Sequence, residues 1–206
     1  LPGQKIGLVI ADVCDKGLGA ALYMILFRSF IRAVSNIDFY ARVKSSDGIS
    51  SEDRLRNAIS LTNNYISETH GDTGMFATIF FGILDTGTGV LTYINGGHLP
   101  PMLINKLGIK EILTLTGPGV GAASDAEYAI REVLVEPDDI FFAYTDGLTE
   151  TENTAGETFS EKELIPLFAL DQTLSSLLLL ILEQMKYFSS GAQQIDDITM
   201  LAFRRE

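Results

Sequence analysis

The 206-residue sequence contains a single cysteine, Cys14, and no long apolar run. One thiol cannot form an internal disulfide, which excludes a disulfide-rich scaffold and favours a reducing compartment, so we predict a cytoplasmic location. The longest unbroken aliphatic run covers only residues 177–182, far below the roughly 20 residues that a transmembrane helix needs. We therefore expect no membrane insertion by this domain.

Positive charge is also scarce, because 15 Lys and Arg residues stand against 27 Asp and Glu residues and give a net charge of -12. No cluster of Lys or Arg could neutralise a run of phosphates, which excludes nucleic acid as a partner. Bound cations, in contrast, would relieve part of the self-repulsion. With 46% hydrophobic residues, the chain can bury a full core, and we predict one domain over residues 1–206.

Apolar periodicity predicts both helices and strands. The expected helices cover 20–36, 51–69, 164–168 and 174–188, with a polar connector at 41–51. The expected strands cover 6–11, 76–84, 90–94, 101–105, 110–115, 128–135, 140–144 and 198–203. Most neighbouring strands should pair as hairpins, including 128–135 with 140–144 around a turn at 136–139. This order predicts a layered α+β sandwich of antiparallel sheets covered by helices.

Acidic residues stand at the ends of three predicted strands: Asp12, Asp146, and the pair Asp196 and Asp197. A carboxylate in such a place must be solvated, paired or bound to a cation, because burying it bare is costly. Each acid alone also fits an ordinary turn or a helix cap. Their joint occurrence favours a site of oxygen ligands for a hard divalent cation.

Spacing argues against two other kinds of phosphate chemistry. After Gly17 and Gly19, the third glycine position of a dinucleotide-binding fingerprint holds Leu22. Cys14 lacks the downstream cationic cradle that a nucleophilic cysteine needs, and we expect it to be a small packed residue. The glycine-rich residues 117–121 lack the Lys-Ser/Thr ending of a phosphate loop and are predicted to be a connector.

The motifs occur in an order that resembles the metal-dependent PP2C-type (PPM) protein phosphatases, and within them the bacterial branch that includes SpoIIE and RsbU. The matching segments are residues 11–17 with 20–22, 74–78, 91–98 with 100–101, 117–121, 144–150 with 156–159, and 196–199. They cover nearly the whole chain, and the ordered set is far more specific than any one segment.

The resemblance implies an αββα sandwich, with helices flanking two antiparallel sheets, and a centre of two Mn²⁺ or Mg²⁺ ions. It implies that the carboxylates of Asp12, Asp146 and Asp196 and the main-chain carbonyl of Val13 are the metal ligands. A one-residue slip to Asp197 is the alternative to Asp196. No catalytic residue is expected beyond these ligands, and no substrate-binding residue is assigned.

Three further residues, Asp15, His98 and His70, are not assigned as metal ligands. Asp15 stands where the family pattern has glycine, so it either tunes the metal turn or faces solvent. His98 follows a strand and the segment 95–97, which is expected chiefly to form a rigid bend. His70 is expected at the surface or as a helix cap.

The function implied by the resemblance is hydrolysis of phosphoserine or phosphothreonine on a regulatory protein by a water that bridges the two ions. The expected substrate is a phosphorylated anti-sigma-factor antagonist of the STAS type. A sensory domain is expected upstream in a longer protein, and a homodimer is a further expectation. Two alternatives stay open at this point: a non-catalytic regulatory or interaction module with the same fold, and a structural metal-binding domain.

The family's first metal acid lies in an upstream Gly-Gly-Asp segment, and nothing similar precedes Asp12 in this sequence. We therefore expect an N-terminally truncated domain from a longer multidomain regulator. It should lack one ligand and at least one edge strand, and it should bind metal weakly or incompletely.

Overall fold

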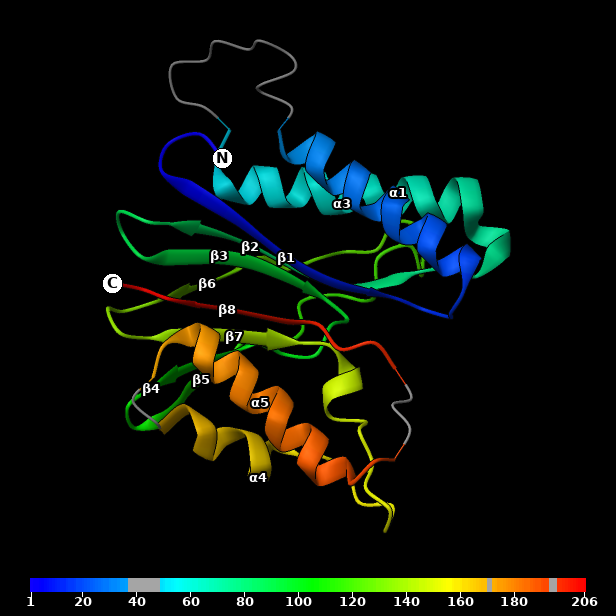
Figure 1. The fold of residues 1–206 in the computed structure, drawn as a ribbon. Helices are drawn as coiled ribbons and strands as arrows, with labels where there is room; N and C mark the ends of the chain where they lie inside the picture. Colours follow the sequence, from blue (N-terminus) through cyan, green and yellow to red (C-terminus); the bar gives the residue numbers. More distant parts are fainter. Residues whose placement is uncertain (37–48, 170–171, 193–195) are drawn as a thin grey trace. The chain divides into compact units, whose positions relative to one another are not determined.

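The computed structural model describes residues 1–36, 49–169, 172–192 and 196–206. These residues form two compact units, each built from two stretches of the chain: 1–98 with 114–134, and 99–113 with 135–206. In its described residues, each unit has one four-stranded antiparallel sheet and two α-helices (Figure 1). The predicted α+β class is confirmed, whereas most of the predicted connector at 41–51 lies outside the described residues.

The first unit combines two long helices with a sheet of strand order β1-β2-β3-β6. Its elements are β1 (Lys5–Val13), α1 (Leu18–Ser35), α3 (Ser51–His70), the 3-10 turn η1 (Gly71–Thr73), β2 (Ala77–Asp85), β3 (Val90–Gly96) and β6 (Arg131–Leu134). Helix α3 begins where the sequence predicts, because the Ser50 hydroxyl accepts a hydrogen bond from the Asp53 main-chain N–H at 3.0 Å. Both helices lie on the same face of the sheet (Figure 1).

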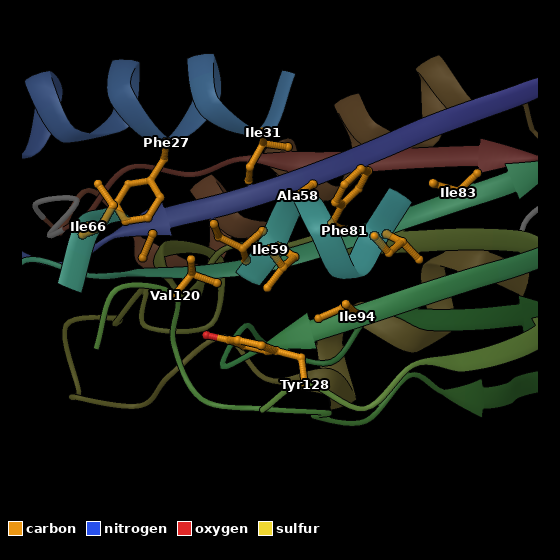
Figure 2. Close-up of a cluster of buried hydrophobic side chains, with 13 residues drawn as sticks. Phe27, Ile31, Ala58, Ile59, Ile66, Phe81, Ile83, Ile94, Val120 and Tyr128 are labelled. Carbon is orange, nitrogen blue, oxygen red and sulfur yellow. The ribbon is translucent and has the colours of Figure 1, made fainter. Parts of the chain in front are cut away.

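Alternate residues of β2 form the core beneath these helices. Ile79, Phe81 and Ile83 share one face of the sheet, because successive side chains of a strand point to opposite faces. They cluster with Phe27 of α1 and Ile59 of α3 (Figure 2). Each of the five is at most 2% exposed, and full burial of such a side chain contributes about 1.5–3 kcal/mol. This core fixes the position of β2 in the first unit.

The second unit has the strand order β5-β4-β7-β8. Its elements are β4 (Met102–Asn105), β5 (Gly108–Ile112), β7 (Ile140–Tyr144), the 3-10 turn η2 (Asp146–Leu148), α4 (Glu161–Leu164), the 3-10 helix η3 (Ile165–Ala169), α5 (Leu174–Ser189) and β8 (Met200–Arg204). Leu177, Ile181 and Met185 recur every fourth residue of α5 and enter the same buried cluster as Phe142 of β7. The predicted helix at 164–168 is instead a short α-helix followed by a 3-10 helix.

Strands β6 and β7 do not pair, so the predicted hairpin between 128–135 and 140–144 is wrong. β6 pairs with β3 in the first unit, whereas β7 pairs with β4 and β8 in the second. The turn-like residues 136–139 follow the point where the chain leaves the first unit for the second. The residues of a strand do not identify the strand with which it pairs. Its alternation of apolar and polar residues is the same whichever strand lies beside it.

Helix α1 is the one helix within the described ranges that has the length and apolar composition to cross a membrane. Apolar helices of ordinary folded domains meet the same criteria, and in α1 the side chains of Phe27 and Ile31 pack into the core of the first unit. Leu18, Leu22 and Ile25 of the same helix are exposed by 77%, 58% and 56%. The expectations of no membrane insertion and of a homodimer both stay predictions.

Strand β1 lies at an edge of its sheet and, in the described chain, pairs with β2 alone. The Cys14 N–H donates to the Phe76 carbonyl at 3.0 Å, and the alternation of an antiparallel ladder then directs the backbone groups of Lys5 away from β2. The amino group of Leu1 donates to the Lys5 carbonyl at 2.9 Å, after a turn at residues 2–4. The chain at Leu1 therefore lies along the outer edge of β1.

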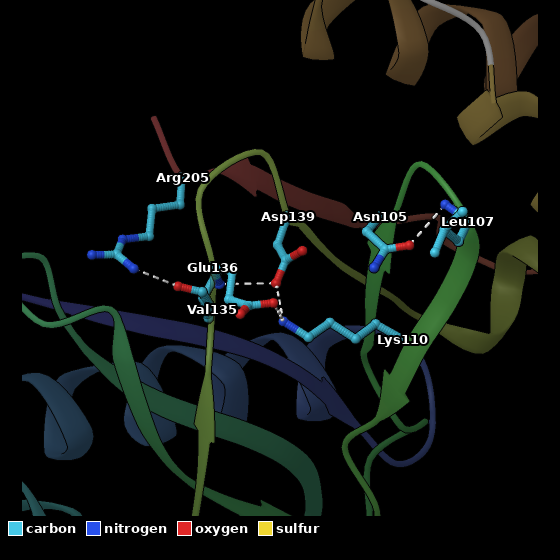
Figure 3. Close-up of polar contacts among 7 residues, drawn as sticks. All are labelled: Asn105, Leu107, Lys110, Val135, Glu136, Asp139 and Arg205. Carbon is cyan, nitrogen blue, oxygen red and sulfur yellow. Dashed lines mark hydrogen bonds and ion pairs between the residues drawn. The ribbon is translucent and has the colours of Figure 1, made fainter.

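A buried carboxylate ties β5 to the loop before β7. Asp139 is 3% exposed, and its Oδ2 accepts hydrogen bonds from Lys110 Nζ at 2.6 Å and from the Glu136 N–H at 2.9 Å (Figure 3). The Glu136 carboxylate accepts a second bond from Lys110 at 2.6 Å. Burial alone would lower the pKa of Lys110, but the hydrogen bonds to Asp139 and Glu136 outweigh it and raise the pKa above its usual value.

Replacing Lys110 by methionine should lower the free energy of unfolding by about 2 kcal/mol, because Asp139 stays buried and loses its cationic partner. The matched control is Lys106→Met, which removes an ion pair to Asp138 of 3.7 Å whose side chains are 87% and 71% exposed; it should cost less than about 0.5 kcal/mol. Urea denaturation at pH 7 measures both.

The pH dependence follows from the raised pKa of Lys110. Since it lies above the unfolded value of about 10.4, the stabilisation is fully present at neutral pH and is lost as pH rises through the folded pKa. Equal losses of stability in Lys110→Met and Lys106→Met at pH 7 would contradict this role.

Candidate functional site

The first acidic turn lies at the end of β1 in the first unit. Asp12 is the cross-strand partner of Thr78 on β2, and both Asp12 and Val13 are partly exposed. Beyond them, Cys14 continues the ladder to Phe76 and accepts a hydrogen bond from the Phe76 N–H on its Sγ at 3.2 Å. Cys14 therefore has a structural role, closing the turn onto the loop before β2.

The turn between β1 and α1 requires two unusual backbone conformations. Asp15 has a φ of 69°, in the left-handed region that favours glycine, and its carboxylate accepts a hydrogen bond from the Lys16 N–H at 2.8 Å. Gly17, at the start of α1, has φ 87° and ψ -156°, a conformation essentially restricted to glycine. The glycine that the resemblance leads us to expect at position 15 would suit this angle, and aspartate is one of the few other residues that tolerate this region.

The second and third acidic segments lie side by side in the second unit. The Thr145 N–H donates to the Thr199 carbonyl at 3.0 Å, and the Thr145 hydroxyl accepts from the Thr199 N–H at 2.9 Å. The same hydroxyl donates to the Asp197 carbonyl at 3.2 Å. Thr145 therefore holds the start of the Asp146 turn against the segment that carries Asp196 and Asp197.

Glycine at position 147 makes this approach possible. A Cβ placed there would lie 2.3 Å from the main-chain oxygen of Asp197 and 3.2 Å from that of Asp196. Because both obstructing atoms belong to the backbone, a side chain could not be accommodated by a rotamer change. The Asp-Gly pair of this motif therefore combines a carboxylate with the one residue that fits beside the neighbouring segment.

Asp146 carries a polar atom with no hydrogen bond. Its Oδ1 is buried and has no hydrogen-bond partner among the described residues. The Asp146 main-chain carbonyl, in contrast, accepts from the Glu150 N–H at 2.8 Å and from the Thr149 hydroxyl at 3.2 Å. Burying a polar atom in this way costs free energy unless a partner satisfies it. A hard cation is one such partner, so this oxygen fits the role of a metal ligand.

The two acids of the third segment differ in exposure. Asp196 is partly buried and its Oδ1 accepts a hydrogen bond from the Asp197 N–H at 2.8 Å, whereas Asp197 is exposed. This difference agrees with the choice of Asp196 as the ligand of the pair.

Asp12 and Val13 belong to the first unit, and Asp146 and Asp196 belong to the second. Within the described ranges, no three His, Cys, Asp or Glu residues form a group that could hold a metal ion. The ligand set stays a prediction.

His98 is a buried residue with hydrogen-bonding contacts to two other side chains. It is 2% exposed, its N–H donates to Asn95 Oδ1 at 2.9 Å, and its Nδ1 lies 3.0 Å from the Thr78 hydroxyl. The rigid bend expected from the sequence is therefore present, and it delivers the imidazole ring to β2. Sequence reasoning missed the contact with Thr78, although both residues lie in segments that match the family.

The glycine-rich residues 117–121 form a tightly packed connector, and the sequence predicts a connector here. Asn63 of α3 is fully buried, and its Oδ1 accepts hydrogen bonds from the Gly121 N–H at 2.8 Å and the Tyr128 hydroxyl at 3.1 Å. Its Nδ2 donates to the Ala123 carbonyl at 2.9 Å. Burial raises the pKa of Tyr128, so its hydroxyl stays a donor. This connector is a structural part of the first unit.

Comparison with known families gives one match over almost the whole chain. The family model described as "Stage II sporulation protein E (SpoIIE)" matches residues 2–206. The chain is 38% identical over 218 aligned positions to Protein IcfG of Synechocystis, covering 100% of this chain and 34% of that protein. It is 29% identical to the phosphoserine phosphatase RsbU of Bacillus subtilis, covering 73% of this chain and 41% of that protein. The chain thus spans well under half the length of these two relatives.

Solved structures agree with the fold. The SiaA-PP2C domain of Pseudomonas aeruginosa matches 99% of this chain and 81% of that chain with a TM-score of 0.75 at 16% identity. A structure of RsbX in complex with magnesium matches 98% of this chain and 82% of that chain with a TM-score of 0.61 at 14% identity. At such identities the likeness shows a PP2C-like fold.

Replacing Gly147 by alanine should destabilise the protein by about 2 kcal/mol or more, because the added methyl group overlaps the backbone of the neighbouring segment. The control is Gly71→Ala at a position with helical φ of -55° and nothing within 4 Å of the added atom; it should change stability by less than about 1 kcal/mol. Thermal unfolding of both variants measures the difference, and an unaffected Gly147→Ala protein would show that the two segments separate freely.

Replacing Asp15 by glycine should leave the free energy of unfolding within about 1 kcal/mol of the wild-type value, whereas Asp15→Val should lower it by about 1–2 kcal/mol. The reason is the left-handed φ, which a β-branched side chain adopts with the most strain. Chemical denaturation distinguishes the two variants. Equal stability of the valine and glycine proteins would rule out the backbone explanation.

Proposed function

Because the chain belongs to the SpoIIE family of PP2C-type phosphatase domains, we propose that it hydrolyses phosphoserine or phosphothreonine on a regulatory protein, in a reaction that requires Mn²⁺ or Mg²⁺. The family membership supports the reaction class, as does the likeness to RsbU, whose name describes a phosphoserine phosphatase. The observation that carries the metal requirement is the buried Asp146 Oδ1, which has no hydrogen-bond partner among the described residues.

The proposed ligands form a set of oxygen atoms only. They are the carboxylates of Asp12, Asp146 and Asp196 and the main-chain carbonyl of Val13. Such hard ligands suit Mg²⁺ or Mn²⁺ better than softer metals. The RsbX structure in complex with magnesium supports the choice of a divalent cation in this fold. When bound, two such ions would supply the hydrolytic water and offset the charge of the phosphoryl group.

The chain's own residues would contribute chiefly by position. Thr145 bonds the Asp146 turn to the segment of Asp196, and Gly147 lets the two backbones come close. Neither contact involves a charged group, so both are available whether or not a cation is bound. No residue is assigned the role of a covalent nucleophile, which agrees with direct hydrolysis by water.

We further propose a phosphorylated anti-sigma-factor antagonist of the STAS type as the substrate, with a sensory domain elsewhere in a longer cytoplasmic protein. The small share of IcfG and RsbU that the chain spans supports a multidomain parent. With a net charge of -12, binding of a phosphoprotein should depend strongly on the cations.

The alternative is a non-catalytic module that keeps the fold and binds its partner without turnover. What favours it is that, in the part of the chain that the structure describes, no three potential ligand side chains gather into a metal site. The two proposals differ in one measurable property, the metal-dependent release of phosphate.

The test compares hydrolysis of a phosphoserine peptide by the complete gene product, by residues 1–206 alone, and by Asp146→Asn in the complete product. We expect turnover by the complete product with Mn²⁺, and a fall of at least about 100-fold in Asp146→Asn, equivalent to about 2.7 kcal/mol of lost transition-state stabilisation. The exposed Asp138→Asn variant in the same unit is the control and should keep the wild-type rate.

An inactive complete product in the presence of Mn²⁺, or an unchanged rate in Asp146→Asn, would overturn the proposed reaction and favour the binding module. Activity of the complete product without activity of residues 1–206 would show that the reaction needs residues outside 1–206.

A further inference from the structure

A chain of hydrogen-bonding groups runs from the buried ring of His98 to the main chain of Asp12, entirely within the first unit. Asn95 Oδ1 fixes the His98 backbone, and His98 Nδ1 lies 3.0 Å from Thr78 Oγ1. The Thr78 hydroxyl in turn donates to the Asp12 carbonyl through a long hydrogen bond of 3.5 Å. The chain of polar groups therefore ends at the peptide bond between Asp12 and Val13. Both of these residues are proposed to supply metal ligands.

Strand pairing does not require this hydroxyl. Asp12 and Thr78 are already cross-strand partners in the ladder between β1 and β2. The Asp12 carbonyl has two lone pairs and can accept a second hydrogen bond beside the one in the ladder. Valine has nearly the shape of threonine and suits a strand equally well. The Thr78 hydroxyl is therefore a polar addition to a strand that would form without it.

The direction of the hydrogen bonds sets the state of the histidine. A hydroxyl carries one hydrogen, so when Thr78 donates it to the Asp12 carbonyl, the bond to His98 must use a hydrogen on Nδ1. Neutral His98 is then the Nδ1–H tautomer. In this state the ring orients the hydroxyl, and the hydroxyl restrains the plane of the peptide between Asp12 and Val13.

We propose that Thr78 and His98 are positioning residues that aim the Asp12 carboxylate and the Val13 carbonyl at the metal. The inference rests on the proposed function, since it concerns the same ligands. Partners of this kind hold a ligand in its binding orientation before the cation arrives, and their loss typically reduces metal affinity 10- to 100-fold. The ordering of the two oxygens is the property to be tested.

The first experiment measures the Mn²⁺ dissociation constant of the complete gene product by calorimetry. Thr78→Val should raise it by about 10-fold, while Thr78→Ser, which keeps the hydroxyl, should stay within about 2-fold of the wild type. The control is Thr92→Val, which removes a strand hydroxyl bonded to Glu132 at 3.0 Å and should leave the constant unchanged. In EDTA, Thr78→Val should lower the melting temperature by only about 2–6 °C, because the buried His98 Nδ1 loses its partner, so affinities are compared between folded proteins.

The outcomes separate the inference from the proposed function. Mn²⁺ binding by the wild type that is equally tight in Thr78→Val overturns the positioning role and leaves the proposed function standing. A loss of affinity in Thr78→Val that Thr78→Ser does not restore also overturns it. A wild type that binds no Mn²⁺ overturns both.

A second experiment needs no metal. The chain has two histidines, so ¹⁵N imidazole spectra at pH 8, where an ordinary imidazole is neutral, contain two ring systems that His70→Gln assigns. The wild-type His98 should show the Nδ1–H tautomer, and Thr78→Val should shift it toward the Nε2–H form. A wild-type Nε2–H tautomer, or the same tautomer in both proteins, would contradict the proposed chain of hydrogen bonds.

Discussion

The closeness of two backbones at Gly147 determines how the acidic segments of the second unit can be arranged. An added Cβ would lie only 2.3 Å from the Asp197 oxygen, well inside van der Waals contact, so the approach depends on the lack of a side chain. Thr145 then bonds to the same segment through its main-chain N–H and its hydroxyl. Carboxylates of like charge would repel each other, and it is this uncharged contact that keeps their segments together.

The electrostatic situation of the chain agrees with this arrangement. Acidic residues outnumber basic residues by 27 to 15. Two of the acidic side chains have buried oxygens, and their surroundings differ. Asp139 is neutralised by Lys110 and by a main-chain donor. Asp146 keeps a buried oxygen for which the described residues supply no donor. An unsatisfied oxygen of this kind lowers stability, and such costs are typical of positions kept for binding.

Much of the architecture could be predicted from local sequence. The helix at Ser51–His70 follows from the spacing of its apolar residues, and the pairing of β2 with β3 follows from a short turn between two β-branched runs. The partner of β6 could not be predicted, because residues 136–139 resemble a hairpin turn. The alternation of apolar and polar residues does not show which strand lies alongside. Long-range pairing had to come from the structure.

The candidate site was predictable in its residue types and less so in its surroundings. Carboxylates at strand ends marked Asp146 and Asp196, and the structure adds that their segments are bonded together. Asp15 has a positive φ. A motif can therefore prefer glycine at such a position because of the backbone angle φ that the turn requires. The contact between Thr78 and His98 could not be anticipated, because 19 residues and a hairpin turn separate the two positions.

The chain changes units three times, after residues 98, 113 and 134. Neither unit is therefore a continuous stretch of sequence, and no single cut of the gene yields one of them whole. An insertion at any of the three crossings would lengthen a link between the two units. Asp12 in the first unit and Asp146 in the second therefore lie on stretches that alternate along the chain, and the family model matches both units, over residues 2–206.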